Sequence, residues 1–250
     1  MSSRNIDVES GLGVAVKHFW RTRSGQQRRQ GRNTGAKDAG SRGAVTGGKH
    51  ADGFVKLIAA IVRDAGLPNA TIHTSEKTPR TLPGYFRPTK EWDLVVVSGK
   101  DLVAVVEVKS QVGSFGNNFN NRVEEALGNA TDFWTAYKMG AFEPSQRPWL
   151  GYLFMLEEHP TSVRSSKRTS LEPFAVDEAF QERSYLQKYE EVCKRLVREL
   201  LYDAACFFTS NQKAGLKGEF IQPNEELSIG KFAISLHARA AAFAKLAKVR

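Results

Sequence analysis

The sequence predicts a mixed β-sheet flanked by helices, in one α/β (or α+β) domain that follows a basic N-terminal segment. Three observations support this fold class. Two apolar strands joined by a short turn lie near the middle of the chain, amphipathic helical patterns stand on both sides of them, and positive charge is concentrated at the N-terminus. With 250 residues, of which 41% are hydrophobic, the chain can bury a substantial core.

The expected elements follow from hydrophobic periodicity and turn residues. Helices are expected at about 50–65, 122–137, 184–208 and 231–248, and strands at about 71–74, 94–97, 102–108 and 149–156. Irregular segments are expected at 79–88, 113–121 and 161–170, where Pro, Gly, Asn or Ser cluster. We therefore expect a basic segment at 1–49 and a single domain at 50–250, with its central part at about 91–156.

The net charge of +9 suggests a polyanionic partner, most often a nucleic acid. Residues 1–50 hold ten Lys and Arg against three Asp and Glu, so this segment carries +7 of the total. Residues 21–49 are rich in Arg, Gly, Gln and Ser, which predicts a mobile basic arm or long loop. Its candidate phosphate contacts are Arg28, Arg29 and Arg32. The alternative for this segment is a solvated linker.

Cysteine usage and hydropathy indicate the compartment. Cys193 and Cys206 both fall within the helix expected at 184–208, so they cannot bridge, and no disulfide framework is visible. The chain shows neither an apolar leader segment nor an apolar run long enough to span a bilayer. We expect a cytoplasmic protein that does not interact with membranes.

The stretch EWDLVVVSGKDLVAVVEVKS, residues 91–110, carries the chemistry. Asp93 begins its first strand, and Glu107 and Lys109 stand near the end of the second. The open ends of an antiparallel hairpin are neighbours, and residues two apart in a strand share a face. The two carboxylates and the ammonium group are therefore expected to converge. The alternative is a salt-bridged Glu–Lys pair with Asp93 as a strand cap.

Two buried carboxylates at one point require a cation to neutralise them. Mg²⁺ prefers oxygen ligands, so Asp93, Glu107 and the backbone carbonyl of Val108 form a candidate site for it. An ion held there would polarise a phosphate and lower the pKa of a bound water, and Lys109 would orient that water or stabilise charge on the phosphate. This arrangement predicts hydrolysis of a phosphodiester.

The same stretch resembles the PD-(D/E)xK nuclease core, with Asp93, Glu107 and Lys109 matching the two acids and the lysine. The longer run EVKSQVGSFGNNFNNRVEEALGNATDFW, together with RGAVTGGKHADGF nearer the N-terminus, is similar to the XhoI-type family of type II restriction endonucleases. One departure is that Trp92 stands where the motif usually has proline. Trp92 can pack in that place.

The resemblance implies a restriction-endonuclease-like core in a homodimer that cuts double-stranded DNA with Mg²⁺ at the palindrome 5′-CTCGAG, and we expect 5′-phosphate ends. It also implies a companion DNA methyltransferase that protects the host DNA. Some relatives of this fold add an acid from the preceding helix. Asp52 or Glu76 could serve here, and the alternatives are that Asp52 caps its helix and that Glu76 is solvated.

Candidate DNA-binding residues follow the second strand. Asn and Arg can bond base edges in the major groove, and Gln111 would face the same side as Lys109. The other residues of this group are Asn117, Asn118, Asn120, Asn121 and Arg122, and the basic loop adds Arg164, Lys167 and Arg168. Turn formation, helix capping (above all by Asn121) and a solvated loop are the alternatives.

Two other functions remain open from the sequence. A repair or junction-resolving nuclease on the same core would cleave DNA by its structure rather than its sequence. A non-catalytic DNA-binding protein would use the acids only for packing, and it would bind DNA equally with or without Mg²⁺.

Overall fold

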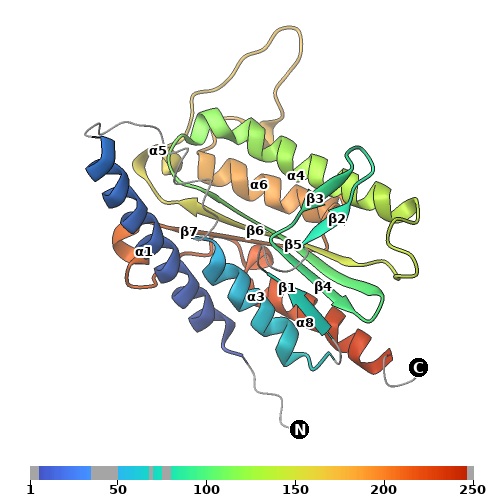
Figure 1. The fold of residues 1–250 in the computed structure, drawn as a ribbon. Coiled ribbons are helices and arrows are strands. Elements are labelled where there is room, and N and C mark those ends of the chain that lie inside the picture. The colour runs from blue at the N-terminus through green and yellow to red at the C-terminus, as the bar shows by residue number, and fades with distance from the viewer. Residues whose placement is uncertain (1–5, 35–49, 68–69, 75–79, 247–250) are drawn as a thin grey trace.

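A computed structural model describes residues 6–34, 50–67, 70–74 and 80–246, without the side chains of 26–34 and 70. It confirms the predicted fold class, because a central mixed sheet lies between two layers of helices (Figure 1). The sheet has five strands in the order β1-β4-β5-β6-β7, and a separate small sheet pairs β2 with β3. The strands are β1 (Ala70–His73), β2 (Thr81–Pro83), β3 (Thr89–Glu91), β4 (Leu94–Ser98), β5 (Asp101–Gln111), β6 (Trp149–Glu157) and β7 (Ala204–Ser210).

Strand β5 is the centre of the sheet, and its two neighbours run in different directions. It pairs antiparallel with β4 and parallel with β6, while β1 and β7 complete the two sides. The helices are α1 (Val8–Thr34), α3 (Asp52–Asp64), α4 (Phe115–Lys138), α5 (Pro160–Val163), α6 (Tyr185–Arg198), α7 (Gln212–Gly215) and α8 (Ile229–Leu246). None of the helices in the described ranges is long and apolar enough to cross a membrane.

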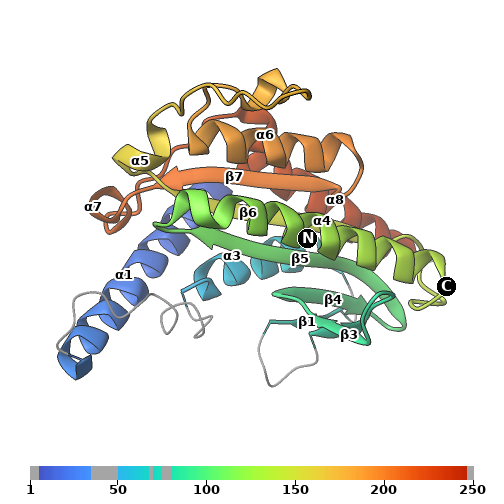
Figure 2. The same cartoon turned by 90° about the horizontal axis from the view of Figure 1, so that it is seen from above.

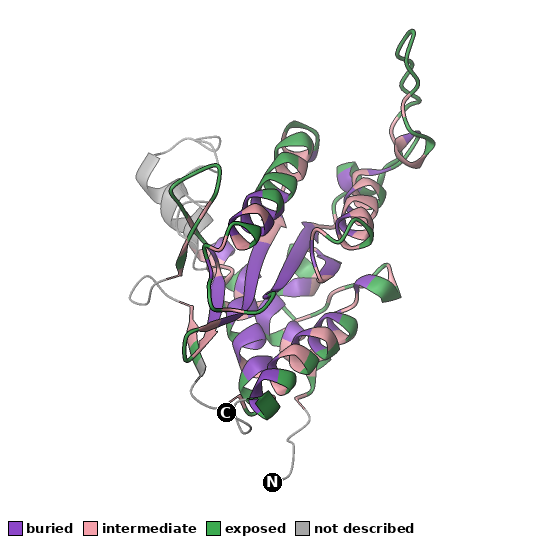
Figure 3. Cartoon of the chain, turned by 90° about the vertical axis from the view of Figure 1, so that its right-hand side faces the viewer, coloured by how far each residue is buried: buried purple, intermediate pink, exposed green. Residues whose placement is uncertain are grey.

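Alternating side chains of the sheet enter two separate cores. Val96 and Val106 pack with α1, α3 and α8 on one face, whereas Val95 and Val105 pack with α4 and α6 on the other. Figure 2 shows α3 and α4 on opposite sides of β5. In Figure 3 strands β5, β6 and β7 of the central sheet are mostly buried, and the exposed helix surfaces face outward. The β4–β5 hairpin is therefore covered by helices on both faces of the sheet.

The expectation of a mobile arm is wrong for residues 21–34, which belong to helix α1. The helix begins at Val8 and buries a stripe with helical spacing against α3, made of Leu12, Ala15, Val16, Phe19 and Trp20. Arg and Gln are good helix formers, so a helix anchored by this stripe continues through the basic segment. Residues 35–49 lie outside the described ranges.

The helix expected at 184–208 is also wrong in its second half. Helix α6 ends at Arg198, Leu200 adopts a positive φ of 56°, and the chain then enters strand β7. Cys193 therefore lies in α6 and Cys206 in β7, and both are buried free thiols. The sequence AACFFTS has the β-branched and aromatic content of a strand, but its apolar residues happened to continue the helical spacing.

Two segments expected to be irregular contain regular structure. Most of 113–121 forms the first turns of α4, which begins at Phe115 after Ser114 in a left-handed conformation with a φ of 47°. The Pro-rich segment 79–88 contributes strand β2 and the turn that leads into β3. The expected helices near 50–65 and 231–248 and the expected strands at 71–74 and 149–156 are confirmed, with shifts of a few residues at their ends.

Candidate active site

The acids of the hairpin meet at its open end. Leu94 of β4 pairs with Val106 of β5 in antiparallel register. Asp93, the residue before Leu94, therefore lies opposite Glu107, the residue after Val106. The Asp93 carboxylate accepts a hydrogen bond of 2.8 Å from the backbone N–H of Val108. Pairing of the two strands thus brings together the three residues that the motif analysis selected, since Lys109 shares the face of Glu107.

Glu107 is the most buried member of the group, with 1% of its surface exposed. It forms ion pairs with two lysines, Lys109 and Lys90. Lys90 comes from β3, and its Nζ lies 3.1 Å and 3.3 Å from the two Glu107 carboxylate oxygens. The side-chain amide of Asn129 in α4 donates a longer bond of 3.5 Å to the same carboxylate. Neither Lys90 nor Asn129 was anticipated from the sequence.

The surroundings raise the pKa of both Asp93 and Lys109, for different reasons. Burial raises the pKa of Asp93, and the neighbouring Glu107 carboxylate adds to this effect, so the pKa reaches about 6 despite the nearby lysines and the Val108 N–H. Burial alone would lower the pKa of Lys109, but the Glu107 and Asp93 carboxylates outweigh it and raise the pKa above its usual value. Lys109 therefore stays protonated at neutral pH.

A cavity of about 240 Å³ opens beside Asp93 and Lys109. Gln111, Asn118 and Arg122, three of the expected DNA-binding residues, contribute to its lining. Its opposite wall comes from the N-terminal part of the chain, which supplies further lining residues that sequence reasoning missed. These are Phe19, Arg23, His50, Ala51 and Phe54.

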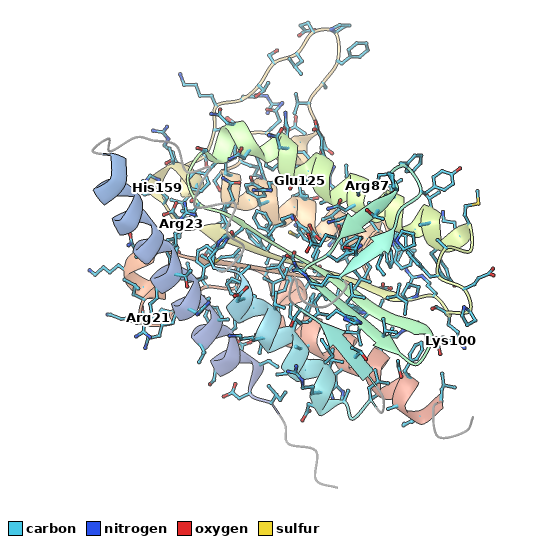
Figure 4. All side chains as sticks on the ribbon, viewed as in Figure 1. Arg21, Arg23, Arg87, Lys100, Glu125 and His159 are labelled. Carbon is cyan, nitrogen blue, oxygen red and sulfur yellow. The ribbon has the colours of Figure 1, made fainter. Side chains whose placement is uncertain are left out.

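Arg23 and His50 give this wall its polar character. Both Arg23 Nε and His50 Nδ1 are buried, and neither has a hydrogen-bond partner among the described residues. Burial lowers the pKa of His50, and the charge of Arg23 lowers it further. Arg23 also lines a second cavity at the start of α4, together with Glu157 and His159. The labelled Arg23 and His159 side chains lie near each other in Figure 4. A buried guanidinium with an unused donor is suited to an anionic ligand such as a phosphate.

The donor set fits a hard divalent cation. Among the described residues, no group of three or more His, Cys, Asp and Glu side chains is placed to bind a metal ion. The oxygen donors that converge are the carboxylates of Asp93 and Glu107, and the Val108 carbonyl stands between Glu107 and Lys109 on the same strand. Asp93 accepts only the Val108 N–H within the described part of the chain, so lone pairs remain for a cation.

Of the two expected accessory acids, the structure describes Asp52 and does not bring it to this site. Asp52 is the exposed first residue of α3 and does not line the cavity, although its charge acts on His50. Glu76 lies outside the described residues. The described acids at the site are therefore Asp93 and Glu107.

The expected base-reading residues occupy the first turns of α4, and their exposure differs. Asn117, Asn120 and Asn121 are exposed, whereas Asn118 is half-buried at the cavity. Asn121 does not cap the helix, because α4 begins six residues earlier. Gln111 is buried, donates to the Gly113 carbonyl at 2.6 Å and accepts from Arg122 Nε at 3.4 Å, so its side chain connects the end of β5 to α4.

The basic loop expected at 161–170 begins in the short helix α5 and continues into the segment that projects beyond α4 and α6 in Figure 1. Arg164, Lys167 and Arg168 are all exposed there. Arg168 forms a 2.6 Å ion pair with Glu178 of the same segment. Arg28, Arg29 and Arg32 lie in α1, but their side chains are outside the described part of the structure.

The mixed sheet and its central hairpin, which ends in two acids and a lysine, are consistent with a restriction-endonuclease-like core. This core places the protein in the class of nucleases. Comparison with known proteins agrees. The family described as "Restriction endonuclease XhoI" matches residues 29–222. The chain belongs to this family of type II restriction endonucleases and is therefore an enzyme that acts on DNA. Such enzymes generally use divalent metal ions.

Three curated relatives cover most of the chain. The type II restriction enzyme BstVI of Geobacillus stearothermophilus is 47% identical over 207 residues, or 80% of this chain and 91% of the relative. The type II restriction enzyme XhoI of Xanthomonas vasicola is 45% identical over 192 residues, covering 74% of this chain and 73% of the relative. AbrI of Azospirillum brasilense is 47% identical over 171 residues, covering 68% and 76%. None of the solved structures matches the chain.

Proposed function

We propose that this restriction endonuclease hydrolyses double-stranded DNA at the palindrome 5′-CTCGAG in a Mg²⁺-dependent reaction that leaves 5′-phosphate ends. The observation that carries the chemistry is the opposed pair of carboxylates, Asp93 and the buried Glu107, with Lys109 beside them. The choice of site follows from the resemblance to the XhoI-type family, and membership in that family supports it.

Asp93, Glu107 and the Val108 carbonyl would hold the ion. Mg²⁺ bound there supplies a Lewis acid for the phosphate and a water of lowered pKa. Lys109 keeps its proton, because Glu107 and Asp93 raise its pKa. It is therefore better suited to stabilise negative charge on the phosphate, or to orient the water by donating to it, than to remove a proton.

The walls of the cavity would position the DNA backbone. Arg122 and Arg23 lie on opposite sides of Lys109's cavity and can receive phosphates on either side of the scissile one. Side-chain amides in the first turns of α4 would read bases. The assigned residues are Asn117, Asn118, Asn120 and Asn121 for bases, Gln111 for orienting Arg122, and Arg28, Arg29, Arg32, Arg164, Lys167 and Arg168 for phosphates.

A palindromic target pairs naturally with a twofold homodimer in which each active site cuts one strand. We propose this assembly, together with a cognate DNA methyltransferase that protects the host DNA and a cytoplasmic location. Residues 50–250 contain every residue that we assign to catalysis. Analytical ultracentrifugation with and without a duplex that carries the site tests the dimer, because a DNA-bound monomer would contradict it.

A digest tests the activity directly. The purified protein is incubated with a plasmid that carries one CTCGAG site and with a copy that lacks it, in Mg²⁺ and in EDTA. We expect linearisation of the first plasmid only, and only with Mg²⁺. End-labelling of the product with and without phosphatase treatment then identifies 5′-phosphate ends. Cleavage of both plasmids at other discrete positions would retain the chemistry and reject the specificity, while structure-dependent cutting would favour a repair-type nuclease.

A further inference from the structure

Lys90 is a second lysine at the candidate metal site, and its side chain is largely buried. Its side chain is 11% exposed, and its Nζ contacts both carboxylate oxygens of Glu107. The same Nζ donates to the backbone carbonyl of Glu91 at 2.9 Å and lies 4.4 Å from the centre of the Trp92 ring. Four favourable contacts in a site shielded from water hold this ammonium in place.

The hairpin that carries Lys90 is itself anchored to α4. The buried carboxylate of Asp132 accepts backbone N–H groups from Tyr85 and Phe86 at 2.9 Å and 2.7 Å, and it pairs with Arg87 at 2.8 Å. Arg87 also donates to Asn129, which in turn donates to Glu107. The position of Lys90 beside Glu107 is thus fixed by the fold of the β2–β3 hairpin.

The charges of the metal-free site cancel. Two carboxylates, Asp93 and Glu107, face two ammonium groups, Lys90 and Lys109. A divalent cation would leave this group with two excess positive charges, and it would have to share Glu107 with Lys90, which already contacts both of its oxygens. Burial of excess charge is costly unless an anion balances it.

We propose that Lys90 is an internal counter-ion that competes with the divalent metal ion for Glu107, and that it thereby links metal binding to DNA binding. In the free protein, Lys90 keeps metal binding weak. A DNA phosphate at the cavity supplies the negative charge that the metal-loaded site lacks, so DNA strengthens metal binding and, by reciprocity, the metal strengthens DNA binding. The inference rests on the proposed metal site at Asp93 and Glu107.

Lys90→Met tests the proposal, because methionine keeps an unbranched stem over Trp92 and removes the charge. Lys100→Met is the matched control, since Lys100 lies exposed at the β4–β5 turn, distant from Arg23 and the cavity wall (Figure 4). Isothermal titration calorimetry with Ca²⁺ and with Mg²⁺ measures metal affinity without DNA. We expect Lys90→Met to bind either ion at least about tenfold more tightly than the wild type, and Lys100→Met to match the wild type.

DNA binding gives the second readout. The affinity of each protein for a CTCGAG duplex is measured by fluorescence anisotropy in Ca²⁺ and in EDTA, and the ratio of the two affinities reports the coupling. We expect the ratio to fall in Lys90→Met, because the excess charge of its metal-loaded site is smaller. A purely structural role for Lys90 predicts weaker or unchanged metal binding and an unchanged ratio, and either result would overturn the proposal.

Folding is measured in parallel, since Lys90→Met leaves the buried Glu107 with one cation fewer. We expect Ca²⁺ to raise the Tm of Lys90→Met more than that of the wild type, and a variant that folds only with Ca²⁺ would also support the competition. A variant that Ca²⁺ cannot rescue would refute it. Metal titration of Asp93→Asn distinguishes failure of the proposed metal site from failure of this inference. If Asp93→Asn binds the metal ion as the wild type does, the proposed metal site is rejected. If binding depends on Asp93 but is not tighter in Lys90→Met, only this inference is rejected.

Discussion

Asp93, directly before β4, and Asp132, in α4, are both largely buried aspartates, yet their surroundings shift their pKa values in opposite directions. Burial raises the pKa of each carboxyl group. At Asp132, Arg87 and two backbone N–H groups outweigh burial, and the pKa falls below its usual value. At Asp93 the neighbour is a second carboxylate, Glu107, and the pKa rises to about 6. The fold gives the Asp132 carboxylate several donors, whereas Asp93 accepts a single hydrogen bond, from the Val108 N–H, within the described residues.

The difference separates a buried charge that the fold itself uses from the charge that we assign to the active site. Asp132 uses its lone pairs to hold the turn of the β2–β3 hairpin, so its charge has no capacity for a ligand. Asp93 accepts a single bond from Val108 within the described residues and borders a cavity. A buried acid that destabilises the metal-free protein is a feature that selection for activity can retain.

The largest effect should come from Asp93→Asn, which preserves shape and the acceptor for Val108 but removes the negative charge. We expect cleavage of a CTCGAG plasmid to fall by at least about a thousandfold, because the site loses half of its carboxylate ligands. The matched control, Asp132→Asn, should retain activity within about tenfold. Wild-type rates in Asp93→Asn, measured as single-turnover cleavage, would remove Asp93 from the catalytic site.

For the stability of the fold, we expect substitution of Asp132 to matter more than substitution of Asp93. Asp132→Ala leaves the N–H groups of Tyr85 and Phe86 and the Arg87 guanidinium without their acceptor. Because Arg87 is partly exposed, water reduces the loss, and we expect about 2–3 kcal/mol of destabilisation. Urea unfolding in EDTA measures it. A loss no larger than that of an exposed control such as Glu124→Ala would show that the hairpin does not depend on this carboxylate.

The pH dependence of stability should identify Asp93 in the metal-free protein. Its pKa is higher in the folded state, about 6, than its ordinary value of 3.8. The folded state therefore binds the proton more tightly, so this group's contribution to stability is present at low pH and is lost as pH rises through about 6. The difference in unfolding free energy between Asp93→Asn and the wild type should grow by about 1–3 kcal/mol from about pH 4 to about pH 7. A constant difference would contradict the raised pKa.

The convergence of Asp93, Glu107 and Lys109 could be predicted because it depends on local rules. An antiparallel hairpin with a short turn brings its two ends together, and strand periodicity decides which side chains share a face. Lys90 is only three residues before Asp93, but its contact with Glu107 depends on the β2–β3 hairpin, whose strands of three residues gave no usable periodicity. Short strands next to Pro and Gly resemble irregular chain in sequence.

The opposite wall of the cavity could not be predicted for a different reason. Arg23 reaches the site because α1 packs on α3, a contact between segments that are distant from the hairpin in sequence. Its basic neighbours predicted a mobile arm or long loop, whereas the apolar stripe between Leu12 and Trp20 anchors the helix that carries it. The strand at 204–210 was not predicted, because its apolar residues continue the helical spacing of α6. Hydrophobic periodicity alone therefore does not show where a helix ends.

The smallest effect is expected at an ion pair on the protein surface, which can be compared with the buried pair of Lys90 and Glu107. Arg168 pairs with Glu178 in the segment before α6, where both side chains are exposed, whereas Lys90 pairs with Glu107 in the protein interior. Water and salt screen the exposed pair, so Glu178 competes only weakly with a DNA phosphate for Arg168.

Glu178→Gln should therefore strengthen DNA binding by less than about threefold, and the gain should vanish at high salt. Glu172→Gln in the same segment is the control, because it removes the same charge from an acid that does not pair with Arg168. Fluorescence anisotropy over a series of salt concentrations measures both variants. Equal gains would assign the effect to net charge alone, whereas a large gain specific to Glu178→Gln would mean that the surface pair restrains Arg168 as firmly as the buried pair restrains Lys90.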